Sequence, residues 1–129
     1  VFELTERCNY AKVVDLRDRL ARLRALGFRI AVDDVGAGYS GLATFSTIDP
    51  SYVKLDLSLV RDLHASQVRR ELVGSVVRTC RSLGIGVIAE GVGAVEELKI
   101  LCELGCGLFQ GFLFARPAPE PPAVVWPAP

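Results

Sequence analysis

The sequence predicts an α/β fold in which parallel strands alternate with helices. A local unit recurs along the chain: a helix ends at Gly27, Gly84 or Gly105, an apolar stretch follows, and a polar residue closes that stretch. Strands that alternate with helices favour parallel crossovers, and near-continuous apolar strands favour a sheet that is covered on both faces or closed into a barrel. With 129 residues and 50% hydrophobic composition, the chain is expected to form one domain with a packed core.

Two kinds of local pattern predict the individual elements. Strands are expected where short apolar or alternating stretches end in a polar residue, at residues 1–4, 28–32, 52–56 and 85–89, and in a shorter stretch between Gly105 and Gln110. Helices are expected in the stretches between them, most clearly where apolar residues recur at helical spacing before a glycine, at residues 11–26, 41–46, 72–83 and 94–104.

Polar residues at the ends of the predicted strands are expected to meet at one rim. In parallel α/β folds the C-terminal strand ends form the working face. The residues that this rule brings together from distant parts of the chain are Glu3, Asp33, Asp34, Lys54, Asp56, Glu90 and Gln110. Neighbouring carboxylates suit a hard cation such as Mg²⁺ or Mn²⁺, and an adjacent pair offers oxygens to two ions.

Most of these residues also have a plainer interpretation. In the Asp-Asp loop, Asp34 or Ser40 can cap the next helix while Asp33 is solvated or salt-bridged. Lys54 can extend to solvent past its apolar neighbours. Glu90 and Gln110 can be ordinary loop residues.

Composition and charge limit the classes of function. A formal net charge of zero and a pI near 6.8 give no basic field for DNA binding. No signal-peptide pattern and no run of 18 apolar residues occurs, so a cytoplasmic protein without a membrane span is expected. Four cysteines lack CxxC spacing, and Cys80 and Cys102 fall on apolar helix faces, which predicts buried thiols in a reducing compartment. The last thirteen residues hold six of the seven prolines and predict a flexible tail.

Five motifs resemble, in order and spacing, the C-terminal half of the EAL domain family. They are Glu3-Leu4-Thr5-Glu6, Asp33-Asp34-Val35-Gly36-Ala37-Gly38-Tyr39-Ser40, Val53-Lys54-Leu55-Asp56, Ala89-Glu90-Gly91-Val92 and Gln110-Gly111-Phe112-Leu113-Phe114. The resemblance covers residues 1–117 as a partial EAL domain and leaves residues 118–129 as a Pro-rich tail. It implies a partial (β/α)₈ TIM-like barrel. It also implies bacterial second-messenger signalling, in which Mg²⁺ or Mn²⁺, as one ion or two, supports hydrolysis of cyclic di-GMP to linear pGpG.

The resemblance implies a role for each rim residue. Metal ligands are expected at Glu3, Asp33, Asp34 and Glu90, with Asp33 placed to bridge two ions. Catalytic roles are expected at Lys54, Glu90 and Asp56, and substrate contacts at Gln110 and Asp56. Glu6 matches a glutamate that steadies the Asp-Asp loop. Phosphodiester chemistry agrees with this set, because cations neutralise the phosphate and lower the pKa of a bound water.

Departures from the family pattern predict that this chain is inactive on its own. Val35, Ala37 and Gly93 stand where the family usually has phenylalanine, threonine and a second glutamate. The Glu-Ala-Leu motif, an arginine and an asparagine belong to the first half of the family domain, so we expect a truncated chain that is covered by that half or by a second copy. The first hypothesis is that the chain is a piece of a phosphodiesterase. The alternative is a degenerate module that binds cyclic di-GMP or a protein partner without hydrolysis. A sugar or cofactor enzyme has less support, because no phosphate-cradling Gly-rich loop precedes a helix.

Overall fold

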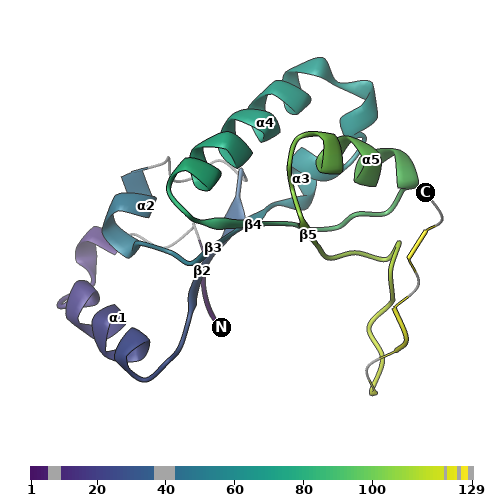
Figure 1. Cartoon of the computed structure of the whole chain (residues 1–129). Helices are drawn as coiled ribbons and strands as arrows, with labels where there is room; N and C mark the ends of the chain where they lie inside the picture. Colours follow the sequence, from purple (N-terminus) through teal and green to yellow (C-terminus); the bar gives the residue numbers. More distant parts are fainter. Residues whose placement is uncertain (6–9, 37–42, 121, 125, 128–129) are drawn as a thin grey trace.

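The computed structural model describes residues 1–5, 10–36, 43–120, 122–124 and 126–127. Over these residues the chain forms one parallel five-stranded sheet whose strand order follows the sequence (Figure 1). The strands are β1 (Phe2–Thr5), β2 (Ile30–Val35), β3 (Tyr52–Leu55), β4 (Gly86–Ala89) and β5 (Leu108–Phe109). The predicted parallel α/β fold is therefore confirmed.

Helices fill the connections between successive strands. They are α1 (Leu16–Ala25), α2 (Ala43–Ile48), α3 (Leu57–Val60), α4 (Gln67–Ser82) and α5 (Val95–Glu103), with short 3-10 turns η1 (Tyr10–Lys12) and η2 (Leu63–Ala65). In Figure 1, α4 and α5 lie together over one face of β4 and β5, while α1 and α2 lie near β2. None of the helices in the described ranges is long and apolar enough to cross a membrane.

One departure from the expected boundaries bears directly on the rim, and it is the end of β2. The apolar pattern predicts a strand that ends at Val32, but β2 continues to Val35. Asp33 pairs with Thr5 of β1, and the register between β2 and β3 shifts between Val32 and Val35. Asp34 takes a positive φ of 60°, as expected where an extra residue bulges out of a ladder. The strand continues because backbone pairing, and not side-chain polarity, holds it there.

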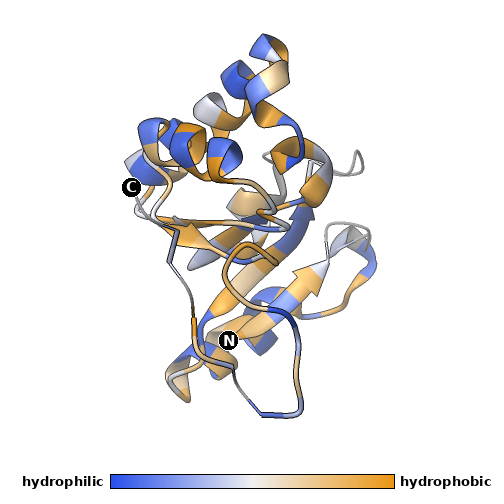
Figure 2. Ribbon diagram, turned by 90° about the vertical axis from the view of Figure 1, so that its right-hand side faces the viewer, coloured by the Kyte–Doolittle hydropathy of each residue, from blue (hydrophilic) through white to orange (hydrophobic). Residues whose placement is uncertain are grey.

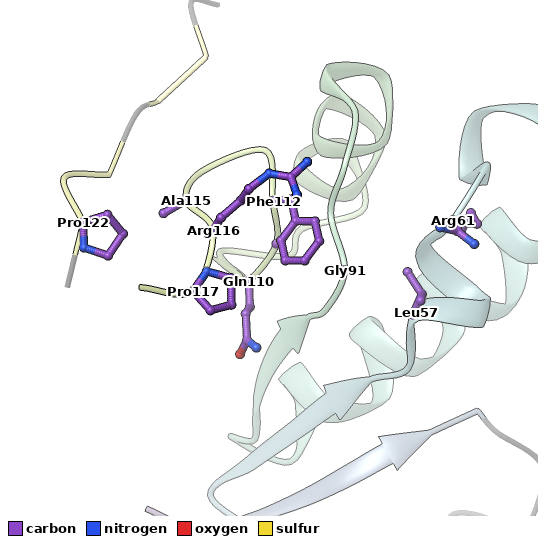
Figure 3. A pocket seen from close by; sticks show the side chains of 10 residues that line it. Leu57, Arg61, Gly91, Gln110, Phe112, Ala115, Arg116, Pro117 and Pro122 are labelled. Carbon is purple, nitrogen blue, oxygen red and sulfur yellow. The ribbon is translucent and has the colours of Figure 1, made fainter. Parts of the chain in front are cut away.

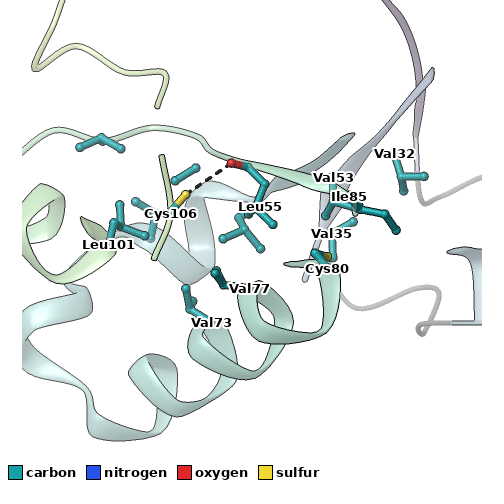
Figure 4. Packing of buried hydrophobic residues seen from close by; sticks show 14 of the residues in the cluster. Val32, Val35, Val53, Leu55, Val73, Val77, Cys80, Ile85, Leu101 and Cys106 are labelled. Atoms are coloured by element: carbon teal, nitrogen blue, oxygen red, sulfur yellow. Dashed lines mark hydrogen bonds between the residues drawn. The ribbon is translucent and has the colours of Figure 1, made fainter. Parts of the chain in front are cut away.

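The core lies between the sheet and the helices. Every third or fourth residue of α4 points into it, so Val73, Val77 and Cys80 are buried against the strands (Figure 4). Cys106 is also buried, and its thiol donates to the carbonyl oxygen of Val87 over 3.4 Å. The hydropathy colours agree, since the helices carry hydrophilic residues on their other sides (Figure 2). The expectation that Cys102 is buried was wrong: its side chain is exposed, because it lies at the outer end of α5.

The opposite face of the sheet is open. Tyr52, Ile88 and Leu108 line a hollow of about 430 Å³ there, together with Val1, Glu3, Phe109 and Gln110. This hollow spans the sheet from β1 to β5, so the acidic rim borders a partly apolar surface.

The Pro-rich tail touches the domain through aromatic rings. Trp126 packs edge-on against Phe114 with ring centroids 5.2 Å apart, and Phe114 stacks on Phe109 at 6.2 Å. Trp126 nevertheless remains 65% exposed. The tail thus meets the sheet at its β5 edge.

Candidate metal and phosphate site

Lys54 is the centre of the candidate site. Its ammonium lies 2.9 Å from Glu90 Oε1, 3.0 Å from Glu3 Oε2 and 3.1 Å from Asp33 Oδ1, so that it contacts acids from three different strands or strand ends. The side chain is only 7% exposed, so the interpretation in which Lys54 extends to solvent was wrong. A buried ammonium needs such partners, since desolvation without them is costly.

The acids converge because parallel strands bring their ends to one edge. Asp33, Asp34 and Glu90 each place a carboxylate oxygen within 4.8 Å of the other two. Neighbouring strand residues normally face opposite sides of a sheet. The irregularity of β2 at Asp34 therefore explains how two consecutive acids reach the same site. We call Lys54, Glu3, Asp33, Asp34 and Glu90 the Lys54 cluster.

Charge and burial shift the pKa values within the Lys54 cluster. Burial lowers the pKa of Lys54, but hydrogen bonds to Glu90, Glu3 and Asp33 outweigh it and raise the pKa above its ordinary value. Burial raises the pKa of Glu90, and the negative charges of Asp33 and Glu3 add to this rise, while Lys54 opposes it. The four carboxylates of the cluster exceed its single ammonium, so the site favours additional positive charge.

The donor set fits a divalent cation. Hard ions such as Mg²⁺ and Mn²⁺ prefer carboxylate oxygens. The spacing of Asp33, Asp34 and Glu90 lets one ion reach all three carboxylates after small side-chain rotations, and Glu3 adds a fourth acid at the other side of Lys54.

Two further rim residues lie beside the cluster, and one lies outside the described part of the chain. Gln110 follows β5, and its backbone N–H donates to Ala89 just before Glu90. Asp56 follows β3, where its side chain accepts the Ser58 N–H at 2.8 Å and caps α3. Glu6, expected to steady the Asp-Asp loop, falls outside the described residues.

An apolar pocket opens next to Gln110. It has a volume of about 450 Å³ and is lined by Leu57, Arg61, Gly91, Gln110, Gly111, Phe112, Ala115, Arg116, Pro117 and Pro122. In Figure 3, Leu57 and Arg61 face Phe112 and Arg116 across it. The Arg116 guanidinium lies 4.8 Å from the centre of the exposed Phe112 ring. Gln110 thus joins the acidic rim to a pocket that offers aromatic and cationic contacts.

Glu97 is a buried acid that the sequence reasoning missed. Its side chain accepts three backbone hydrogen bonds, from Asp62 at 3.0 Å, Gly93 at 2.9 Å and Ala94 at 3.1 Å. A glutamate at the third position of a helix is a capping signal. It was not recognised because Ala94, at the start of α5, has no side-chain oxygen and gives only half of a capping box.

We expect Glu97→Ala to cost about 2 kcal/mol of folding stability at pH 7, because three partly buried N–H groups lose their acceptor. Burial by itself raises the pKa of Glu97, but the hydrogen bonds from Gly93, Asp62 and Ala94 outweigh it and lower the pKa below its ordinary value of 4.5. The contribution of Glu97 is therefore complete above pH 4.5 and is lost as the pH falls through the lower folded-state pKa.

Urea denaturation at pH 7 and at about pH 3 measures this effect. The stability gap between Glu97→Ala and the unmodified chain should narrow at the lower pH, whereas Glu96→Ala, at an exposed neighbour on α5, should stay within about 0.5 kcal/mol at both. A gap of equal size at both pH values would contradict the assignment.

The fold and site define part of a (β/α) barrel whose acidic strand ends fit a divalent cation. Comparison with known proteins gives the family. The family model described as "EAL domain" matches residues 1–117, and the chain belongs to this family.

Solved structures and a curated relative agree with this assignment. The calcium and cyclic di-GMP complex of BlrP1 from Klebsiella pneumoniae is 47% identical with a TM-score of 0.83, over 89% of this chain and 29% of that chain. Its manganese and cyclic di-GMP complex gives a TM-score of 0.82. A standalone EAL protein from Vibrio cholerae O395 with bound c-di-GMP is 35% identical with a TM-score of 0.84, over 96% of this chain and 53% of that chain.

The curated relative is the cyclic di-GMP phosphodiesterase RocR of Pseudomonas aeruginosa, which is 39% identical over 93% of this chain and 31% of its own length. The chain therefore spans about a third of this relative, 29% of the BlrP1 chain and 53% of the Vibrio cholerae chain. The expected family and fold, part of a TIM-type barrel, are confirmed.

Proposed function

We propose that this chain supplies the metal- and phosphate-binding rim of a cyclic di-GMP phosphodiesterase that forms pGpG. The observation that carries the proposal is the Lys54 cluster, in which a buried ammonium and an excess of carboxylates meet at the C-terminal strand ends. Metal-bound relatives with cyclic di-GMP support it.

Each residue has a defined part in this proposal. Glu3, Asp33, Asp34 and Glu90 hold Mg²⁺ or Mn²⁺, which neutralises phosphate charge and lowers the pKa of a bound water. Lys54 adds fixed positive charge where negative charge develops on the phosphate. Asp56 and Gln110 orient the dinucleotide beside the metal. Phe112 and Arg116 in the neighbouring pocket suit a planar base. The free thiols of Cys80, Cys102 and Cys106 suit a reducing compartment, the cytoplasm.

Asp33→Asn should weaken Mn²⁺ binding by about 10- to 100-fold or more. Loss of a residue that only hydrogen-bonds to a metal ligand already produces an effect of that size. Asp33 touches Lys54 and shares the ligand group with Asp34 and Glu90, so the loss of its charge acts at the centre of the site. Calorimetric titration with Mn²⁺ is the measurement, with Asp18→Asn on the exposed side of α1 as the matched control. Indistinguishable titrations of Asp33→Asn and Asp18→Asn would remove Asp33 from the site.

A second candidate function is a receptor that binds cyclic di-GMP without hydrolysis. Gly93, exposed after β4, carries no acid where the family resemblance expects a second glutamate, so a ligand or base is absent from that position. Incubation with cyclic di-GMP and Mn²⁺ separates the two functions. Metal-dependent pGpG that disappears in Glu3→Gln supports the enzyme, whereas tight nucleotide binding without product supports the receptor.

The open face of the sheet is proposed to be covered by the rest of an EAL domain or by a second copy of the chain. Tyr52, Ile88 and Leu108 are apolar side chains on that face, and β1 and β5 are sheet edges that can pair with further strands. We expect sedimentation over a concentration series to show association of the 129-residue chain. A stable monomer at every concentration would contradict this expectation.

A further inference from the structure

Glu97 is a buried carboxylate whose partners come from two separate parts of the chain. Its side chain is 6% exposed, and both carboxylate oxygens accept backbone N–H groups. Oε2 binds Gly93 and Ala94 at the start of α5, whereas Oε1 binds Asp62, 35 residues earlier in the chain. A helix cap needs only the bonds that Oε2 accepts. The bond from Asp62 to Oε1 is therefore an additional cross-link between two parts of the chain.

The two segments that Glu97 joins both lead to the Lys54 cluster. Gly93 ends the short loop that begins with Glu90 after β4, while Asp62 follows α3, which is capped by Asp56 at the end of β3. Lys54 lies on β3, two residues before Asp56. If the loop after β4 moves away from the segment after β3, the 2.9 Å contact between Lys54 and Glu90 lengthens as well.

The loop after β4 is held at two other points as well. A Cβ atom at Gly91, where φ is +68°, would lie 2.3 Å from Leu57 Cδ1, so Leu57 packs directly on the loop backbone. The Val92 N–H donates to the Gln110 carbonyl over 3.1 Å. Leu57 and Gln110 thus fix the middle of the loop, and Glu97 fixes its end.

The backbone at Asp62 is left-handed, with a φ of 53°. Its own side chain makes no capping hydrogen bond to η2. The Asp62 N–H donates instead to Glu97 over 3.0 Å.

We infer that Glu97 is a positioning residue of the site, which holds the loop bearing Glu90 against the segment that follows Lys54 and Asp56. The inference rests on the proposed function, because the cluster that it positions is the proposed metal site. Loss of the cross-link lets the loops after β3 and β4 move apart, and Glu90 then lies less well placed for a shared cation.

Glu97→Gln separates the cross-link from the helix cap. Glutamine keeps the size of the side chain but has only one acceptor oxygen. When that oxygen faces Gly93 and Ala94, the amide nitrogen faces the Asp62 N–H, so two donors meet and the cross-link is lost. Glu96→Gln is the matched control, because it makes the same charge change at the exposed neighbouring residue.

Calorimetric titration with Mn²⁺ tests the inference on the whole chain, with circular dichroism to check that each variant is folded. Glu97→Gln should bind Mn²⁺ about 10- to 100-fold more weakly than Glu96→Gln, the loss typical of groups that orient metal ligands. Folded Glu97→Gln that binds Mn²⁺ as tightly as Glu96→Gln would overturn the inference.

A second measurement keeps the inference distinct from the proposed function. An unmodified chain that fails to bind Mn²⁺ counts against the proposed metal site, and amide hydrogen exchange then decides the role of Glu97. The Val92 amide, which donates to Gln110, should exchange at least about tenfold faster in Glu97→Gln than in Glu96→Gln, because the loop loses one of its anchors. Equal exchange at this amide would overturn the cross-link whatever the metal result.

Discussion

Lys54→Met should destabilise the fold by about 3–5 kcal/mol at pH 7, the cost of removing one partner from a buried ion pair. Methionine nearly preserves the volume of the side chain, so the lost stability measures the removal of the positive charge. Glu90, Asp33 and Glu3 would be left close together without the ammonium that now lies within 3.1 Å of each. The lower end of the range is expected, since Glu3 is half exposed and solvent screens it.

The pH dependence of this loss follows from the pKa shifts. The pKa of Lys54 is raised in the folded state, so its contribution is complete below the ordinary value of 10.5 and is lost as the pH rises through the folded-state value. The pKa of Glu90 is also raised, so its protonated form favours folding below 4.5, and this contribution is lost as the pH rises through the folded-state pKa. The deficit of Lys54→Met should therefore shrink as acid protonates Glu90.

Urea denaturation between pH 4 and pH 8 is the measurement, and Lys99→Met on the exposed side of α5 is the control. Lys99→Met should change stability by less than about 0.5 kcal/mol. Added Mn²⁺ should stabilise Lys54→Met more than the unmodified chain, because a cation can replace the missing ammonium. A Lys54→Met protein as stable as Lys99→Met would show that the ion pairs do not hold the rim together.

Gly111→Ala should lower the folding stability by at least about 3 kcal/mol, which is the upper end of the range for overpacked side chains. A Cβ atom at this position would lie 2.1 Å from the carbonyl oxygen and 2.4 Å from the nitrogen of Val92, and these backbone atoms cannot rotate away. Val92 is fully buried. Its N–H donates to Gln110 and its carbonyl accepts from Leu113, both over 3.1 Å, so the two backbones are locked together.

Gly107→Ala is the matched control for Gly111→Ala. An added Cβ at Gly107 meets nothing within 4 Å, so this variant should keep its stability within about 0.5 kcal/mol. Thermal denaturation followed by circular dichroism compares the two. Equal melting temperatures would mean that the loops after β4 and β5 are not in contact in solution.

Elements with a clear period could be predicted from the sequence, and short or irregular ones could not. The helical spacing of Val73, Val77 and Cys80 predicts the C-terminal part of α4, which the structure extends back to Gln67. The four residues of α3 (Leu57–Val60) were missed because one turn is too short to show a helical period. The end of β2 was missed because two acids interrupt the apolar pattern while the backbone ladder continues.

The residues of the rim could be named in advance, but their contacts could not. The rule that parallel strand ends share an edge was enough to bring Lys54 and Glu90 together. Whether Lys54 reaches solvent or acids depends on how β3 pairs with its two neighbours, β2 and β4. Glu97 depends on a contact with Asp62 that no local spacing reveals.

The agreement between strand order and sequence order also bears on how the chain folds. Each strand pairs with the strands immediately before and after it in the sequence, so no connection has to pass an element that is made later. Such a sheet can grow by one strand and helix at a time as the polypeptide emerges from the ribosome. The Lys54 cluster draws on distant members of this series, since Glu3 lies on β1 and Glu90 follows β4. The charged centre is therefore assembled only when the fourth strand docks against the three strands before it.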